Sequence, residues 1–173
     1  MDRQRAAEDA LQRSQIMRSL AAYSPTVVST IWAGLDIASS DIDVVCQYTD
    51  QEQFKTILTS ACSHFPGFNI VDNHEYVVAR FTADQFEIEV FASALPIDQQ
   101  AGYIHFLVMQ RLVELGGAEF QAAVRSLKRS GLKTEPAIAQ LLHLAGDPYE
   151  AVAALRDLPD HKLTELMENR KNV

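Results

Sequence analysis

The stretch SSDIDVVCQY, residues 39–48, joins a buried-strand pattern to two aspartates at its start. Aspartate is depleted in strands because its short polar side chain competes for backbone hydrogen bonds. Residues i and i+2 of a strand point to the same face, so Asp41 and Asp43 are expected to project together. Ile42 and Val44 then point to the opposite, apolar face. Two carboxylates on one face of a buried strand require a chemical explanation.

A second acidic strand, FEIEVF at residues 86–91, offers a partner for the first. Glu87 and Glu89 alternate there with apolar residues, so these two carboxylates also share one face. If the two strands are neighbours, Glu89 or Glu87 converges on Asp41 and Asp43. Carboxylates at such close range repel one another unless protons, water or a cation intervene.

This acidic pattern favours a site for Mg²⁺, or for Mn²⁺ in its place, made by Asp41, Asp43 and Glu89. Mg²⁺ binds one or two carboxylates together with substrate phosphates. Two such ions can activate an attacking oxygen and stabilise a leaving one. The plainer alternative is that acidic residues at strand ends are solvated edge groups. On Asp-x-Asp alone the solvated edge groups are the preferred interpretation, and the case for a metal depends on the sequence upstream.

The composition limits the class of protein. The chain has 173 residues, 47% of them hydrophobic, which suits a globular fold with a core of its own. Its net charge of −8 disfavours a large nucleic-acid surface, because affinity there comes from many cationic contacts to phosphates, although a nucleotide can still bind locally. The sequence lacks an apolar run of membrane-spanning length and a signal-peptide core, so we expect a cytoplasmic protein without membrane contact. Cys46 and Cys62 are expected to be reduced packing residues.

The order of elements predicts an α+β fold, a mixed β-sheet of about four or five strands flanked by helices, with an all-helical C-terminal portion. We expect an α/β core over residues 1–96 and the helical portion over residues 97–173. The expected strands are 26–32, 41–48, 68–73, 76–82 and 86–92, with a hairpin at 83–85. The expected helices are 3–22, 51–64 with Asp50 as N-cap, 101–115 ending at Gly116-Gly117, 118–129, 134–144, 148–155 and a last one after Asp160.

The segment VVSTIWAGLDIASSDIDVVC, residues 27–46, resembles the signature of the nucleotidyltransferase superfamily, which has the DNA polymerase β-like fold. That signature is a strand ending in Gly-Gly or Gly-Ser, a loop, and Asp-x-Asp on the next strand. A third carboxylate comes from a later strand, and Ile88-Glu89-Val90 matches it.

More narrowly, residues 27–154 resemble a bacterial family of nucleotidyltransferase-like proteins known as a domain of unknown function. The resemblance is carried by GLDIASSDIDVVC (34–46), FEIEVFASALPIDQQAGYIH (86–105) and GLKTEPAIAQLLHLAGDPYEAV (131–152).

The resemblance implies a Mg²⁺-dependent enzyme that transfers a nucleoside monophosphate from a nucleoside triphosphate to an unknown hydroxyl acceptor. It implies that Asp41, Asp43 and Glu89 are the catalytic and metal-binding residues. The nucleotide-binding candidates are Ser29, Thr30, Gly34, Ser40 and Lys133, the last in a loop before a helix N-terminus. The oligomeric state is open between a monomer and a homodimer.

One position departs from the superfamily pattern. Ser29 stands where a glycine normally lets backbone amides approach the triphosphate, although the hydroxyls of Ser29 and Thr30 could donate to a phosphate. The alternative function is therefore a catalytically degenerate protein that binds a nucleotide or a protein partner without turnover. A purely structural role is the third alternative.

Three further residues have two readings each. His105, on an apolar helix, is favoured as a hydrogen-bonded packing residue over a ligand contact. Arg111 suits a structural salt bridge as well as a phosphate. Lys128, with the neighbouring basic residues, either compensates a helix end or contacts a phosphate.

Overall fold

The computed structural model describes residues 3–169 of the chain. The chain forms two compact units, Met1–Trp32 with Ser40–Tyr103 and Ala33–Ser39 with Ile104–Val173. The expected boundary between residues 96 and 97 lies inside the first unit. Residues 97–103 belong to the same unit as the sheet. Gln100 Nε2 links them to it by donating to the Cys46 carbonyl and to the Leu95 carbonyl, each at 2.9 Å.

The first unit is built on a five-stranded sheet of mixed direction, in the order β1-β2-β5-β4-β3. β2 and β5 pair in parallel, whereas the other neighbours are antiparallel. This confirms the predicted mixed sheet of an α+β fold. The strands are β1 (Thr26–Val27), β2 (Ile42–Gln47), β3 (Asn69–Asp72), β4 (Tyr76–Ala83) and β5 (Phe86–Ser93).

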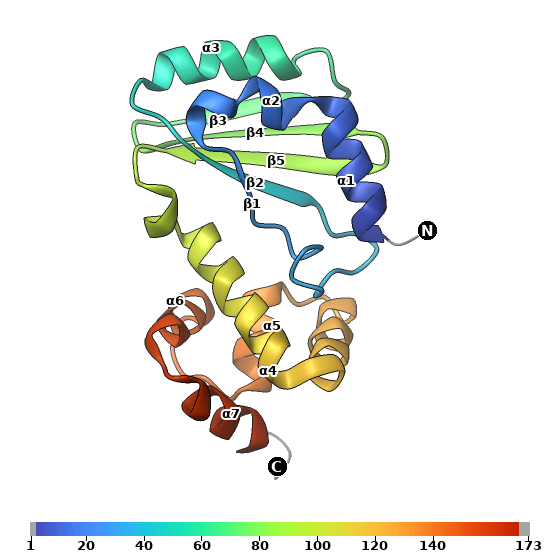
Figure 1. The fold of residues 1–173 in the computed structure, drawn as a ribbon, viewed down its shortest axis with the longest axis vertical. Helices are drawn as coiled ribbons and strands as arrows, with labels where there is room; N and C mark the ends of the chain where they lie inside the picture. Colours follow the sequence, from blue (N-terminus) through green and yellow to red (C-terminus); the bar gives the residue numbers. More distant parts are fainter. Residues whose placement is uncertain (1–2, 170–173) are drawn as a thin grey trace. The chain divides into compact units, whose positions relative to one another are not determined.

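One face of this sheet forms the core of the first unit. The helices α1 (Arg3–Ser14), α2 (Ile16–Ser19) and α3 (Gln51–Cys62) cover it (Figure 1). Alternate residues of the central strands are buried there, namely Ile42, Val44, Cys46, Ile88, Val90 and Ala92. The period-two pattern of β2 and β5 therefore sends their acidic residues to the other face.

The N-terminal helix is shorter than the sequence predicts. A continuous helix over residues 3–22 is wrong, because the helix stops at Ser14 and Gln15 adopts a left-handed φ of 55°. Ser14 Oγ donates to the Leu11 carbonyl at 2.8 Å and accepts from the amide of Ile16 at 3.4 Å. A serine that bonds the backbone in this way competes with the helical ladder. The periodicity continues past the break because residues on both sides face the same core.

The first strand is also shorter than expected. β1 ends at Val27, and only the Val28 amide extends the pairing, by donating to the Asp43 carbonyl at 2.9 Å. The amide of Trp32 then donates to the carbonyl of Ser29, which closes a turn in place of the strand expected to reach residue 32.

Several local predictions are confirmed. The Asp50 side chain accepts from the amide of Gln53 at 2.9 Å, which caps α3. β4 and β5 form the expected hairpin, with Ala83 opposite Phe86 across a two-residue connection. Both cysteines are free and buried, and burial raises the pKa of each thiol to about 12.

The second unit is helical. It includes the helix α4 (Ala101–Arg129) from Ile104 onward. This helix changes direction at Gly117, where φ is 57° and ψ is −155°, so the predicted break at Gly116-Gly117 is confirmed. A Cβ on Gly116 would lie 2.6 Å from the Cβ of Phe120, so the turn needs glycine there as well. The later helices are α5 (Thr134–Leu141), α6 (Pro148–Ala154) and α7 (Asp160–Asn169). None of the helices within residues 3–169, α4 included, has an apolar stretch that could cross a membrane.

Candidate functional site

Two acidic residues are neighbours on the face of the sheet opposite to α1–α3. Asp43 of β2 and Glu89 of β5 are direct register partners in the parallel pair at the centre of the sheet. Neighbouring strands are about 4.8 Å apart, so register partners present their side chains to the same small region. Both residues are half-buried, which leaves each carboxylate accessible from this face. The expectation that the two acidic strands are neighbours is confirmed.

Asp41 lies just before β2 and is also half-buried. Its backbone carbonyl accepts a hydrogen bond from Ser29 Oγ at 2.7 Å. This bond fixes the backbone at the entrance to β2, two residues before Asp43. The two aspartates thus enter the site from one short, anchored segment.

A cation that the sequence analysis missed lies beside these carboxylates. Arg80 of β4 is the direct antiparallel partner of Glu89, and its guanidinium Nη2 forms an ion pair with Glu89 Oε2. The Arg80 side chain is 50% exposed and that of Glu89 25% exposed. Because Asn69 of β3 faces Arg80 in turn, one polar row crosses four strands through Asp43, Glu89, Arg80 and Asn69.

The pairing with Arg80 bears on the expected metal site. Within residues 3–169, no three His, Cys, Asp or Glu side chains lie close enough together to hold a metal ion. Glu89 is instead ion-paired with Arg80 of β4. The residues therefore do not form a ready-made three-carboxylate cage. Their oxygen donors do suit an ion that arrives with phosphates, since Mg²⁺ needs only one or two protein carboxylates in that case.

Ser29 is fully buried, with 0% of its surface exposed. Its hydroxyl donates to the Asp41 carbonyl and accepts from the Ile31 amide at 3.2 Å. The side chain thus connects the segment after β1 to the segment before β2 by hydrogen bonds. Because it is fully buried in this arrangement, it has no surface that a phosphate could contact. Thr30 follows it in the turn and is half-buried.

A second cation that the sequence did not predict, Arg3, lies beside the segment that carries the aspartates. The backbone carbonyl of Ser40 accepts from Arg3 Nη2 at 2.7 Å, directly before Asp41 in the chain. The Arg3 guanidinium also lies over the Phe86 ring, 4.8 Å from its centroid. The N-terminal turn of α1 thus places a positive charge next to the segment that carries the aspartates.

The remaining nucleotide-binding candidates, Gly34 and Lys133, belong to the second unit. Gly34 has a left-handed φ of 70°, a conformation that strains residues with a side chain, so the turn favours glycine. Lys133 is exposed at the N-cap position of α5. The structure brings Asp43 and Glu89 together, with Asp41 and Ser29 beside them, within the first unit.

Other basic residues of the second unit have structural partners. Lys128 is buried, and its Nζ donates to the Leu35 carbonyl at 2.8 Å. Arg125 Nη2 lies 3.1 Å from a carboxylate oxygen of Asp36. These two contacts connect the loop that precedes residue 40 to α4, so Lys128 has a structural role. Arg111 pairs with a carboxylate oxygen of Asp160 at 2.5 Å. Of the two roles that the sequence allowed for Arg111, this is the structural salt bridge.

His105 lies in a buried polar cluster of the second unit. Its Nδ1 is 3.3 Å from Glu135 Oε1, and its Nε2 is 3.0 Å from the Tyr149 carbonyl. Burial lowers the pKa of His105, but the hydrogen bond and charge of Glu135 and the Tyr149 carbonyl outweigh it, so the pKa is raised. For Glu135, burial raises the pKa, yet His105 and the charge of Lys128 leave it lowered. This confirms His105 as a hydrogen-bonded residue and adds its carboxylate partner.

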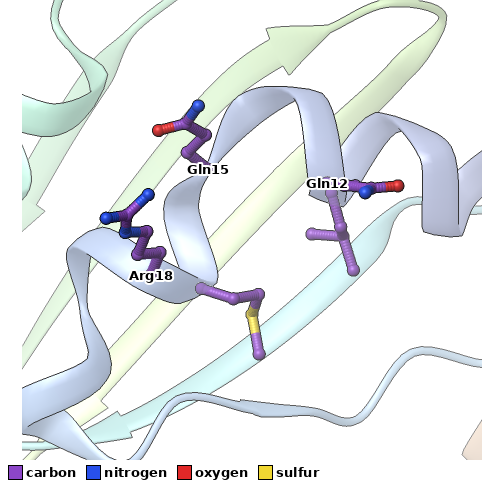
Figure 2. Close-up of a pocket in the computed structure, with 5 residues that line it drawn as sticks. Gln12, Gln15 and Arg18 are labelled. Atoms are coloured by element: carbon purple, nitrogen blue, oxygen red, sulfur yellow. The ribbon is translucent and has the colours of Figure 1, made fainter.

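A pocket opens at the junction of α1 and α2. It is lined by Leu11, Gln12, Gln15, Met17 and Arg18. Figure 2 shows Gln12, Gln15 and Arg18 along this turn. These residues belong to the helices that cover the buried face of the sheet, so the pocket is separate from the carboxylate row.

Comparison with known proteins identifies a family and a fold. The family described as "Domain of unknown function (DUF4269)" matches residues 9–155. No curated protein matches the sequence.

Solved structures share the fold. A structure of a cytoplasmic RNA terminal U-transferase is 17% identical, with a TM-score of 0.54, over 86% of this chain and 43% of that one. A structure of Cid1, described for its RNA terminal uridylyl transferase activity, is 16% identical, with a TM-score of 0.56, over 87% and 44%. The Cid1 poly(U) polymerase with bound MgGTP is 15% identical, with a TM-score of 0.54, over 88% and 49%. The chain therefore has a nucleotidyltransferase-like α+β fold and spans less than half the length of these proteins.

Proposed function

We propose a nucleotidyltransferase function for this chain, which belongs to the family described as Domain of unknown function (DUF4269). In this proposal the chain binds a nucleoside triphosphate together with Mg²⁺, or Mn²⁺ in its place. It then transfers the nucleoside monophosphate to a hydroxyl acceptor. The observation that carries the proposal is the register pair of Asp43 and Glu89, on the face opposite to α1–α3 of a sheet whose fold is nucleotidyltransferase-like.

The roles of the residues follow from their positions. Asp41, Asp43 and Glu89 are the carboxylates that would hold a divalent ion, which would neutralise the triphosphate and polarise the reacting phosphorus. The acceptor oxygen forms a bond to the α-phosphorus while the bond from that phosphorus to the bridging oxygen breaks and pyrophosphate leaves. A site carboxylate takes the hydroxyl proton. Catalysis of this kind rests on positioning and on charge neutralisation.

Two arginines of the same unit carry positive charge close to the acidic residues. Arg80 is half exposed on the face opposite to α1–α3, and Arg3 lies beside the Ser40 carbonyl. An acidic protein that binds a nucleotide needs such local cations, because its overall field repels the ligand. Thr30 and Ser40 complete the proposed nucleotide-binding set of the first unit, with Ser29 as the residue that orders the backbone beside Asp41. Gly34 and Lys133, which belong to the second unit, are separate nucleotide-binding candidates.

A second candidate function is nucleotide binding without turnover. Two observations favour it: the Ser29 hydroxyl is already used inside the fold, and Glu89 is ion-paired with Arg80. Both reduce the number of side-chain groups that can contact a bound metal–triphosphate. The two candidates differ in whether a product forms, and an assay can separate them.

The test combines ligand-induced stabilisation with product analysis. Each of the four common nucleoside triphosphates, with and without MgCl₂, is added to the wild type, to the double variant Asp41→Asn/Asp43→Asn, and to the control Glu75→Gln. Glu75 is exposed near the β3–β4 turn and outside the carboxylate row, so its variant removes one charge without touching the site. A ligand at 100 times its Kd stabilises the native state by about 2.7 kcal/mol.

The expected result is a rise in melting temperature that needs both nucleotide and Mg²⁺, persists in Glu75→Gln and is lost in the double variant. Incubation with α-labelled triphosphates and a metabolite extract, followed by mass spectrometry, then gives a nucleotidylated product from the wild type and the control but not from the double variant. A thermal shift without any product in that incubation would establish the binding protein instead. No shift with any of the four nucleotides would refute both candidates.

A further inference from the structure

Arg80 occupies a particular position relative to the carboxylates. It lies on β4, its register partner is Glu89 on β5, and the register partner of Glu89 on β2 is Asp43. The three side chains therefore stand in line across neighbouring strands, on one face, with charges −1, −1 and +1. The Arg80 guanidinium is ion-paired with Glu89, the carboxylate that is the third metal ligand in the proposed function.

We propose that Arg80 is a built-in competitor of the divalent ion at Glu89, released when the ion arrives with a triphosphate. The guanidinium holds Glu89 before any ligand binds. When a metal–triphosphate binds, the ion takes over the neutralisation of Glu89, and Arg80 pairs with phosphate oxygens. This inference rests on the proposed function, because it assigns Arg80 a positioning role within that same site.

The exposure of the pair makes such an exchange accessible. The Arg80 side chain is 50% exposed and that of Glu89 25% exposed, so both remain in contact with water. Ion pairs of this kind contribute little net free energy, because solvent screens them and the long side chains lose freedom. A doubly charged ion with phosphates attached therefore displaces the guanidinium at low cost. A fully buried pair would instead resist separation.

The chemistry of the guanidinium favours phosphate as its second partner. Its planar fork of N–H donors matches the geometry of carboxylate and phosphate oxygens alike, so one side chain can serve both in turn. Arg80 then opposes the free ion but supports the ion that carries phosphates. Arg80 therefore adds to the positive coupling that already exists between an ion and the phosphates it coordinates.

Calorimetric titration tests the exchange without any catalytic readout. The wild type, Arg80→Gln, Arg80→Lys and Arg13→Gln are each titrated with MnCl₂ alone and with the preformed Mn²⁺–tripolyphosphate complex. Tripolyphosphate carries the phosphate chemistry without a base, so the result does not depend on base preference. Arg13 pairs with Asp84, in the β4–β5 turn and outside the carboxylate row, at 2.5 Å and largely exposed, so it is a matched control for loss of an arginine ion pair.

The expected signature is a pair of opposite changes. Arg80→Gln binds free Mn²⁺ about twofold to fivefold more tightly than the wild type, as expected for loss of a half-exposed competing ion pair. The same variant binds Mn²⁺–tripolyphosphate more weakly. Arg80→Lys retains the positive charge and so keeps the weak binding of free Mn²⁺, but it loses part of the affinity for the complex because it lacks the fork. Arg13→Gln matches the wild type in both titrations.

The outcomes separate the two levels of the proposal. If the wild type binds the complex and Arg80→Gln gives the same affinities, or changes both in the same direction, the exchange is refuted while the site stands. If neither the wild type nor any variant binds Mn²⁺ or its tripolyphosphate complex, the proposed function is refuted together with the exchange. Circular dichroism melts of each variant confirm that the comparison is made on folded protein.

Discussion

The buried cluster around His105 gives a quantitative prediction about pH. Both ring nitrogens face acceptors: Nδ1 lies 3.3 Å from the Glu135 carboxylate and Nε2 lies 3.0 Å from the Tyr149 carbonyl. A neutral imidazole carries one proton and can satisfy only one of the two, whereas the imidazolium satisfies both. The protonated form is therefore favoured in the folded state, even though burial by itself opposes it. The pKa of His105 is raised accordingly.

The sign of the pH effect follows from this direction. Because the folded-state pKa of His105 lies above the unfolded value of about 6.5, its stabilisation is complete below about pH 6.5 and is lost as the pH rises through the folded-state pKa. In that window the native state holds more protons than the unfolded state. The free energy of unfolding then falls by up to about 1.4 kcal/mol per pH unit.

Glu135 sets the acid side of the window. Its pKa is lowered by His105 and by the charge of Lys128 against the effect of burial. Its contribution is therefore present above the unfolded value of about 4.3 and is lost as the pH falls through the folded-state pKa. The pair stabilises the helical unit most between about pH 4.3 and pH 6.5.

Glu135→Gln is the decisive variant because the amide keeps the shape and removes the charge. The variant removes the ion pair with the imidazolium but keeps an oxygen that accepts its hydrogen bond, so we expect a loss of about 1 kcal/mol at pH 6 and a smaller loss at pH 9, where a neutral imidazole forms no ion pair. Urea unfolding at both pH values measures the loss. The imidazole resonances in NMR follow the titration of His105 directly, with His74→Gln as a control because His74 is 88% exposed. A His105 pKa at or below 6.5 in the wild type, or one unmoved by Glu135→Gln, would refute the reasoning.

Two further substitutions test contacts that hold single elements. Lys128→Met leaves the Leu35 carbonyl without its 2.8 Å donor, so we expect a loss of about 1–3 kcal/mol of unfolding free energy, while Lys133→Met, at an exposed position, changes it by less than about 0.5. Equal losses from the two lysines in urea unfolding would contradict the structural role of Lys128. Asp50→Ala removes the N-cap of α3 and should cost about 1 kcal/mol, which Asp50→Ser should largely restore in the same measurement.

The parts of the fold that follow from neighbouring residues were predictable. The cap at Asp50, the break at Gly116-Gly117 and the hairpin between β4 and β5 each depend on a few consecutive residues. The interruption at Gln15 was not, because the apolar period runs on through it while Ser14 Oγ takes over backbone hydrogen bonds. Periodicity reports which side of the chain faces the core, but it does not report whether the backbone between two turns stays helical.

The candidate site divides in the same way. The register of Asp43 with Glu89 requires two strands that lie far apart in sequence to be neighbours. The sequence analysis could assume this neighbourhood but could not predict it. The partners of Lys128 and His105 were beyond reach, since Leu35 and Glu135 come from other elements of the second unit and no local pattern connects them. Burial decided the role of Ser29, and burial of a single serine depends on everything packed around it.

Arg80 is different, because the sequence does contain the signal for its partner. In an antiparallel hairpin the residue numbers of opposite positions have a constant sum, and a two-residue connection at Asp84-Gln85 places Ala83 opposite Phe86. The same sum places Arg80 opposite Glu89. The alternation of the two strands puts both side chains on the face of the acidic residues. The hairpin pattern alone therefore predicts an arginine directly opposite a proposed metal ligand, and such a cation reduces the need for an ion at that carboxylate. Counting acidic residues without the hairpin register overstates how strongly they demand a metal.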